Sequence, residues 1–294
     1  MTRIQWDQTG ERRYEGGVDH GVLYERDPAG EYSTGVEWNG LTTVTESPSG
    51  AESNPQYADN IKYLDLISAE QFAATIEAFT YPDEFEKYDG SPSPVPGVSI
   101  GQQNRKPFGF SYRTKVGNDV EGIDFGYKIH LVYGATAAPS EKARATINDS
   151  PEALNFSWAI STNPVAVGTV GGVEYAPTAT ITLDSTKLPA DKMTMIEDIL
   201  YGDADNDPSM PLPLDVITMM STTTTLATPT EPAYNAGTHT ITIPAVTGVK
   251  YTIDGEEVAA GPVVITEDKI VVAYPETGYH FPDVVDTDWF YDFS

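Results

Sequence analysis

The stretch PGVSIGQQNRKPFGFSYRTKVGNDVEGIDFGYKIHLVYGATA, residues 96–137, decides the fold. It holds two runs in which large apolar residues alternate with small or polar ones: Phe108, Phe110 and Tyr112, then Phe125, Tyr127, Ile129, Leu131 and Tyr133. A period of two is typical of β-strands, whose successive side chains point to opposite faces. A polar connection containing glycine joins the runs. The pattern predicts a long hairpin with one buried aromatic face and one polar, cationic face.

Basic residues gather in and around this hairpin. Seven of the chain's 17 lysines and arginines fall between Arg105 and Arg144, in a protein of net charge −27. Such residues usually have acidic partners, either within the subunit or on a neighbouring subunit. An ordinary amphipathic hairpin with a solvated face fits the same pattern. The first interpretation makes the following residues candidates for subunit contacts: Arg105, Lys106, Arg113, Lys115, Tyr127, Ile129 and Trp38.

The composition limits the possible functions. The chain has 294 residues, enough for one large domain or two moderate ones. With 44 acidic and 17 basic residues, it repels phosphate, which argues against tight binding to nucleic acid or anionic lipid. It contains no cysteine. The N-terminus shows no secretory signal, and no apolar run is long enough to cross a membrane. We expect a soluble protein that is made and assembled in a cytoplasm.

The first third of the chain predicts strands and one helix. Strands are expected at 21–24, at 35–45 with a turn at Asn39–Gly40, and at 61–67, with a polar loop over 46–60. Ser68 is expected to begin a helix that ends at Pro82. The helix signals are a capping-box spacing and an apolar stripe at i, i+4 and i+7, carried by Ser68 with Gln71 and by Phe72, Ile76 and Phe79.

The rest of the chain predicts more strands, a helix and a second domain. Alternating residues at 154–160 and 179–183 indicate strands, and a helix should begin near Pro189 and end at Gly202. A Ser, Thr and Pro-rich linker over 221–232 precedes short alternating runs separated by turns, at 239–243, 249–253, 263–265 and 270–273. We therefore expect a mainly β protein with a few helices, divided into domains 1–228 and 229–294.

No arrangement typical of catalysis is present. The four histidines are scattered, and the sequence lacks metalloprotease, nucleophile-elbow and nucleotide-binding patterns. The spacing of Asp203, Asp205 and Asp207 resembles the start of a calcium loop. However, Pro208 stands where that loop needs glycine, and Leu214 where it needs glutamate. We expect a solvated acidic loop there, no cofactor, no metal and no enzymatic activity.

Several stretches together resemble the major tail tube proteins of long-tailed bacteriophages. They lie in order between residues 18 and about 220, and the principal ones are VDHGVLY at 18–24, YADNIKYL at 57–64, YPDEF at 81–85, GQQNRKPF at 101–108, GYKIHLVYG at 126–134 and DILYG at 198–202. The resemblance implies a β-sandwich or barrel domain that forms hexameric rings. These rings stack into a hollow, acidic tail through which DNA passes without tight binding.

The resemblance also implies partners and a place for each part of the chain. Besides copies of itself, the subunit would meet the tape measure protein and the tail-terminator and baseplate proteins, in the virion. The loop at 46–60 and the N-terminal arm are candidates for contacts between rings. The C-terminal region resembles the small Ig-like domains that decorate such tubes, on the runs VKYTIDG at 249–255, VVAYP at 271–275 and GYHFP at 278–282.

Two other classes of function remain as alternatives. In the first, the protein is a secreted or surface carbohydrate-binding β-module. Its sugar platform would use Tyr274, Tyr279, Trp289 and Phe290, although these are as consistent with a hydrophobic core. In the second, it is a metal-dependent enzyme, which the scattered histidines argue against.

Overall fold

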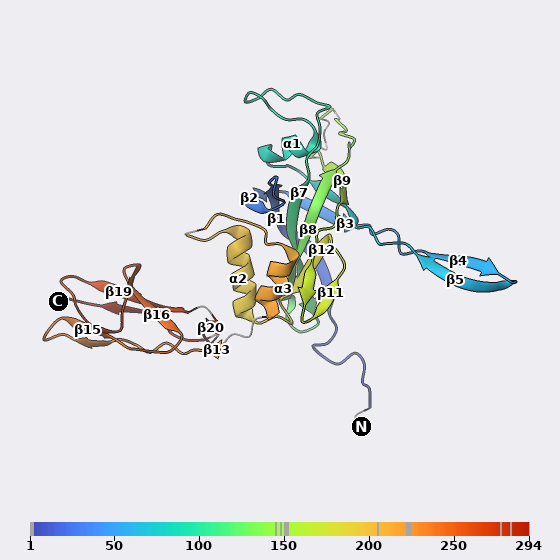
Figure 1. Ribbon diagram of the computed structural model, residues 1–294. Helices are drawn as coiled ribbons and strands as arrows, with labels where there is room; N and C mark the ends of the chain where they lie inside the picture. The colour runs from blue at the N-terminus through green and yellow to red at the C-terminus, as the bar shows by residue number, and fades with distance from the viewer. Residues whose placement is uncertain are drawn as a thin grey trace. The chain divides into compact units, whose positions relative to one another are not determined.

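The computed structural model describes residues 3–144, 146–147, 149, 153–204, 206–221, 225–276, 278–282 and 284–293. It is mainly β, with short helices and several antiparallel sheets (Figure 1). The chain divides into two compact units, residues 1–218 and 219–294. This division comes ten residues before the boundary expected at 228/229. The reason is that Ala227 packs in the core of the second unit, so part of the expected linker belongs to that unit.

The first unit is built on one large sheet whose strand order is β2-β1-β7-β8-β9-β6-β3, with β12 also paired to β8. Its strands are β1 (Tyr14–Arg26), β2 (Tyr32–Trp38), β3 (Leu41–Glu46), β6 (Ala73–Ala78), β7 (Phe108–Asn118), β8 (Gly122–Ala137), β9 (Phe156–Thr162) and β12 (Thr180–Asp184). Smaller elements of this unit are β4 (Ser53–Ala58), β5 (Ile61–Ile67), β10 (Gly168–Val170), β11 (Val173–Tyr175), the 3-10 turn η1 (Asp83–Phe85), α1 (Glu86–Asp89), α2 (Ala190–Tyr201) and α3 (Pro213–Ser221), whose last turn continues into the second unit.

The predicted turn at Asn39–Gly40 is present, but the strands on its two sides do not pair with each other. β2 pairs with β1, and β3 pairs with β6, so the turn carries the chain from one edge of the sheet to the other. The two edges must therefore approach at this end, and the sheet is curled. A side chain on Gly21 would collide with Leu41 Cδ1, only 2.4 Å from the position of its Cβ. Gly21 thus permits the close approach of the edges.

An aromatic core fills the inside of the curled sheet. Trp38 lies at its centre, with ring centroids 4.5 Å from Phe85 and 5.5 Å from both Phe110 and Trp158. The Trp38 indole N–H donates to the backbone carbonyl of Thr80 over 3.0 Å. Aromatic pairs in tilted or edge-to-face geometry contribute beyond their buried area. These contacts fix η1 and the connections between strands onto the inner face.

The outer face of β1, β7 and β8 is also covered, here by α2 and the chain that follows it. The Tyr24 hydroxyl donates to the Leu200 carbonyl over 2.8 Å, and the Tyr133 hydroxyl donates to the Pro211 carbonyl over 2.9 Å. The expected helix with its end at Gly202 is confirmed, since α2 spans Ala190–Tyr201 with Met193, Ile196 and Leu200 buried.

The expectation of one aromatic face on the β7–β8 hairpin is wrong. Phe110 pairs with Val132, and Ser111 pairs with Leu131, so the aromatic residues of β7 and the large residues of β8 point to opposite faces. Paired residues share a face, and a register difference of one residue exchanges the faces. Both faces carry large apolar side chains, because the sheet is covered on both sides.

The expected helix from Ser68 to Pro82 is also wrong. Residues 73–78 form β6, in which Ala74, Ile76 and Ala78 are buried and alternate with half-buried neighbours. β6 pairs with both β3 and β9. The tertiary pairing therefore overrides a helical spacing that rested on three apolar residues.

The second unit is a β-structure with its own core. Its strands form the sheets β14-β15-β18 and β17-β16-β19-β21 and the pair β13-β20. Their bounds are β13 (Thr225–Leu226), β14 (Ala233–Asn235), β15 (Thr240–Ile243), β16 (Val249–Ile253), β17 (Glu256–Val258), β18 (Gly261–Val264), β19 (Lys269–Pro275), β20 (Tyr279–His280) and β21 (Asp288–Tyr291). Ile241, Tyr251 and Val271 are buried in that core. The four alternating runs expected in this region correspond to β15, β16, β18 and β19.

Candidate assembly surface

Strands β4 and β5 form a separate hairpin that extends away from the large sheet of the first unit (Figure 1), and we call it the arm. Every residue of β5 is exposed. The arm carries six large apolar side chains that are 41–71% exposed: Tyr57, Ile61, Tyr63, Leu64, Leu66 and Ile67. An isolated two-stranded hairpin is marginally stable in water, and a contiguous exposed apolar surface marks an interaction site. The arm therefore requires a second surface to cover it.

Both faces of the arm carry apolar side chains. The cross-strand pairs Asn54–Leu66, Gln56–Leu64 and Ala58–Ile61 place three aliphatic residues of β5 on one face. The opposite face presents Tyr57 and Ile67, together with the Lys62–Asp65 ion pair at 2.6 Å. A covering surface on one side would leave the other side exposed. The arm is thus suited to insertion between two surfaces.

The base of the arm is fixed to the sheet. Ser49 and Gln71 exchange two backbone hydrogen bonds, of 2.8 and 2.7 Å, and the Ser47 N–H donates to the Ala73 carbonyl. At the end of β3, a Glu46 carboxylate oxygen accepts a hydrogen bond from the Tyr112 hydroxyl of β7 over 2.5 Å. The arm therefore starts from an ordered base, although its strands β4 and β5 pair with each other and not with the large sheet.

The cations in the middle of the β7–β8 hairpin have partners within the subunit. Arg113 donates to both carboxylate oxygens of Asp19, over 2.8 and 3.1 Å, and its guanidinium lies 5.1 Å from the ring centroid of Tyr127. Burial by itself would raise the pKa of Asp19, but the hydrogen bonds and charge of Arg113 outweigh it and hold that pKa below its usual value. Lys128 likewise pairs with Glu15.

The predicted contact residues occupy three different environments. Trp38 and Ile129 are 2% and 0% exposed, so both lie inside the subunit. Lys115 and Tyr127 are half-buried and paired across β7 and β8, and burial together with Glu197 raises the pKa of Tyr127 to about 12. The two residues that precede β7 differ from each other: Lys106 is exposed, and Arg105 is half-buried. The structure does not gather all seven residues into one patch.

His130 is the centre of a polar cluster that joins several strands. Its ring stacks on Tyr112 at 4.6 Å, and its Nε2 lies 2.9 Å from the Thr114 hydroxyl. Carboxylates of Glu15 and Glu46 lie 3.6 and 3.7 Å from its two ring nitrogens. Burial lowers the pKa of His130, against the opposite effect of these two carboxylates. The two ring nitrogens face different carboxylates, Glu15 on β1 and Glu46 on β3. The cluster therefore links β1 and β3 to β8, and its side chains do not point toward a common ligand position.

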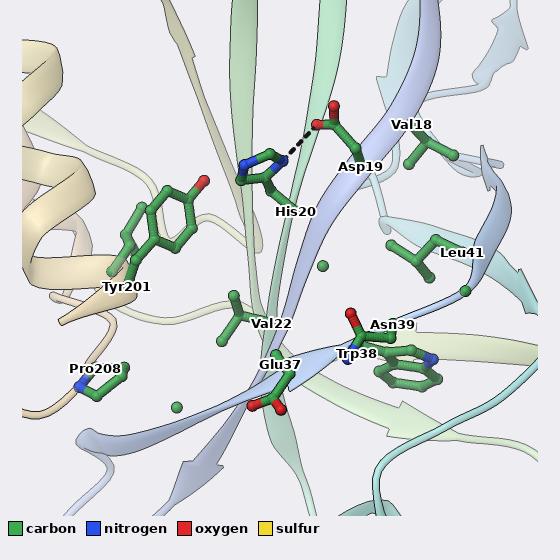
Figure 2. A pocket seen from close by; sticks show the side chains of 14 residues that line it. Val18, Asp19, His20, Val22, Glu37, Trp38, Asn39, Leu41, Tyr201 and Pro208 are labelled. Carbon is green, nitrogen blue, oxygen red and sulfur yellow. Dashed lines mark ion pairs between the residues drawn. The ribbon is translucent and has the colours of Figure 1, made fainter.

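A groove of about 480 Å³ lies between the bulged part of β1, the end of β2 and the end of α2 (Figure 2). His20 has a φ of 50°, its Nδ1 lies 3.0 Å from Asp19 Oδ1, and its ring is 5.8 Å from that of Tyr201. The residues lining the groove in the described chain include no serine, threonine or cysteine. The Asp19–His20 pair therefore has beside it none of the serine, threonine or cysteine side chains that a histidine most often activates.

In the second unit, the four aromatic residues considered for a sugar platform are divided. Tyr274 and Phe290 are 50% and 63% exposed, whereas Tyr279 and Trp289 are partly buried against the core. The residues do not form a single exposed row, and the core interpretation applies to Tyr279 and Trp289.

Within the described part of the chain, no three His, Asp or Glu side chains are grouped so that they could hold a metal ion. Of the calcium motif, Asp203 accepts hydrogen bonds from Asn206, and Asp205 lies outside the described residues. No helix among the described residues is long and apolar enough to span a bilayer.

The arm is the feature that the sequence analysis missed. The sequence predicts a strand over Ile61–Ile67 and a polar loop over 46–60, whereas the structure places β4 within 46–60. A usable signal was present, because a strand with apolar residues on both faces needs cover on both sides. No protein-family model matches this chain, and neither does any curated protein.

Proposed function

We propose that this protein is a self-assembling structural subunit of a bacteriophage tail tube, in which hexameric rings stack into a conduit for DNA. The arm carries the proposal. It is a two-stranded hairpin with exposed apolar side chains on both faces, and its base is hydrogen-bonded to the sheet. Copies of the same chain would supply the surfaces that cover it. The resemblance of residues 18–220 to tail tube proteins supports the same function.

Other properties of the chain are consistent with this function. The first unit has a curled sheet whose outer strand β3 pairs only with β6 and leaves an edge on which a further strand or subunit can pack, whereas Tyr32 and Gly35 of β2 are already hydrogen-bonded to residues 208–210. The net charge of −27 lets DNA pass with few phosphate contacts to slow it. On this proposal, the second unit is an Ig-like decoration of the tube, and the tape measure, terminator and baseplate proteins are the further partners.

Removal of the arm tests the proposal. Because Ser49 and Gln71 exchange both of their backbone hydrogen bonds, a two-residue Asn-Gly turn can replace residues 50–70 with little change to the sheet. Sedimentation velocity should show large assemblies for the full chain at high concentration and monomers for the shortened chain, with the same thermal unfolding of the first unit. A shortened chain that assembles as the full chain does would refute the role of the arm.

A further inference from the structure

A second cavity of the first unit, of about 580 Å³, contains a cation without a partner. It lies at the open end of the β7–β8 hairpin. Its walls come from the turn after α1, the loop over 101–105, the residues that follow β8, and Trp158. No residue of the groove in Figure 2 belongs to it.

Arg105 is the unpartnered cation. Its guanidinium lies close to Gly90, so that a Cβ at position 90 would be 3.2 Å from Cζ and 3.3 Å from Nη2. Its Nε is buried with no hydrogen-bond acceptor, and Arg105 forms none of the ion pairs found among the described residues. An arginine cannot lose its proton to relieve burial. The position of Arg105 is therefore costly in the isolated subunit.

The other charges of the cavity neutralise each other. Lys142 lies 2.7 Å from Asp89, whose side chain is only 5% exposed, and Asp89 also accepts a hydrogen bond from the Ser91 hydroxyl. The cavity thus has a net charge of +1, located on Arg105. Trp158, which is 1% exposed, adds a second buried donor without a partner, its indole N–H. The buried side-chain atoms without a partner among the residues lining this cavity, Arg105 Nε and Trp158 Nε1, are both hydrogen-bond donors, so a ligand that satisfies them has to supply acceptors.

We infer that the cavity at Arg105 binds a carboxylate from a second copy of this chain. A guanidinium matches a carboxylate with two parallel hydrogen bonds, and a half-buried pair of this kind is little screened by salt. The chain has 44 acidic and 17 basic residues, so carboxylates are the most abundant charged groups that a second copy presents. This inference rests on the proposed self-assembly, and it identifies the chemistry of one of its contacts.

Arg105→Met tests the inference because it should weaken assembly without lowering the thermal stability of the subunit. In the monomeric variant that lacks the arm, removal of an unpaired cation should leave the melting temperature unchanged or raise it. In the full chain, the same substitution should raise the critical concentration for assembly roughly tenfold or more, since it leaves the partner's carboxylate unpaired. Lys106→Met is the matched control, and it should change neither quantity.

The outcomes separate the inference from the proposed function. If the full chain assembles and Arg105→Met assembles at the same concentration as Lys106→Met, the inference is wrong and the proposed function is unaffected. If Arg105→Met lowers the melting temperature of the monomer, the guanidinium has a partner within the subunit and the inference is also wrong. If the unmodified chain never assembles, both fail.

Discussion

Replacement of two side chains on the aliphatic face of the arm should block assembly without changing the subunit. The double variant Ile61→Thr, Leu66→Thr keeps strand-compatible residues at both positions and adds a hydroxyl to each. In the isolated subunit these side chains are 61% and 56% exposed, so their replacement removes little internal packing. The thermal unfolding of the variant should therefore match that of the unmodified chain.

The expected loss of assembly follows from the exposed area that a neighbour would cover. Full burial of one leucine or isoleucine side chain contributes about 1.5–3 kcal/mol, and the exposed fractions of 61% and 56% reduce this to about 1–2 kcal/mol for each residue. Together the two substitutions should cost about 2–4 kcal/mol per contact. This corresponds to a decrease of roughly 30-fold to 1000-fold in the association constant of each contact.

Pelleting of assemblies over a concentration series would measure this loss. The matched control is Val264→Thr, Ile270→Thr in the second unit, where the two side chains are 70% and 48% exposed. The control should assemble at the same critical concentration as the unmodified chain. If the arm variant also did so, the aliphatic face of the arm would be no contact, and the reasoning from its exposure would be refuted.

Three other changes have expected results. A chain that ends at Ser221, the end of α3, should still assemble and should keep the unfolding temperature of the first unit, because the second unit has its own core. If this shortened chain folded but did not assemble, the second unit would be part of the tube wall. Ile129→Asp should destabilise the first unit by more than about 4 kcal/mol in chemical denaturation, since it buries an unpaired carboxylate at a fully covered position, and a loss below about 1 kcal/mol would contradict this burial. The pKa of His130 is lowered by burial, so the unfolded chain binds this proton more readily, and the stability of the first unit should fall as the pH drops through the ordinary histidine pKa. His130→Gln leaves Glu15, Glu46 and Lys128 unchanged and should reduce this dependence of stability on pH. An equal slope of stability against pH in both proteins would exclude His130 as its source.

The sequence predicts strands best where their period of two is supported by local turns. The runs that became β15, β16 and β19 are bounded by turns such as Asp254–Gly255, and they form a unit with short connections. The α2 helix was predictable for a similar reason, because Pro189 and Gly202 mark its ends. Local signals suffice for these elements.

Long-range pairing explains the errors. β6 has a helix-like spacing of apolar residues, but its strand state comes from β3 and β9, which are distant in the sequence. The Asn39–Gly40 turn resembles a hairpin turn, yet it links opposite edges of the sheet. The faces of β7 and β8 depend on the register, which no alternation within a single strand reveals.

The charge pairs of the β7–β8 hairpin were predictable, whereas the contact role of the candidate residues stays a prediction. Concentration of basic residues in 105–144 correctly indicated charged pairs, and Arg113 and Lys128 have theirs within the subunit. Trp38 and Ile129 lie in predicted strands, and the sequence does not show that both are covered by their own subunit. Exposure depends on the tertiary packing, which also leaves the apolar residues of the arm uncovered.

Electron microscopy of the purified full chain, negatively stained at high concentration, tests the central claim most directly. Self-assembly through the arm predicts rings or hollow tubes with a continuous central channel, and their absence from the chain in which Asn-Gly replaces residues 50–70. A field of dispersed single particles at every concentration, for the full chain as for the shortened one, would contradict the claim that this protein is a tube subunit.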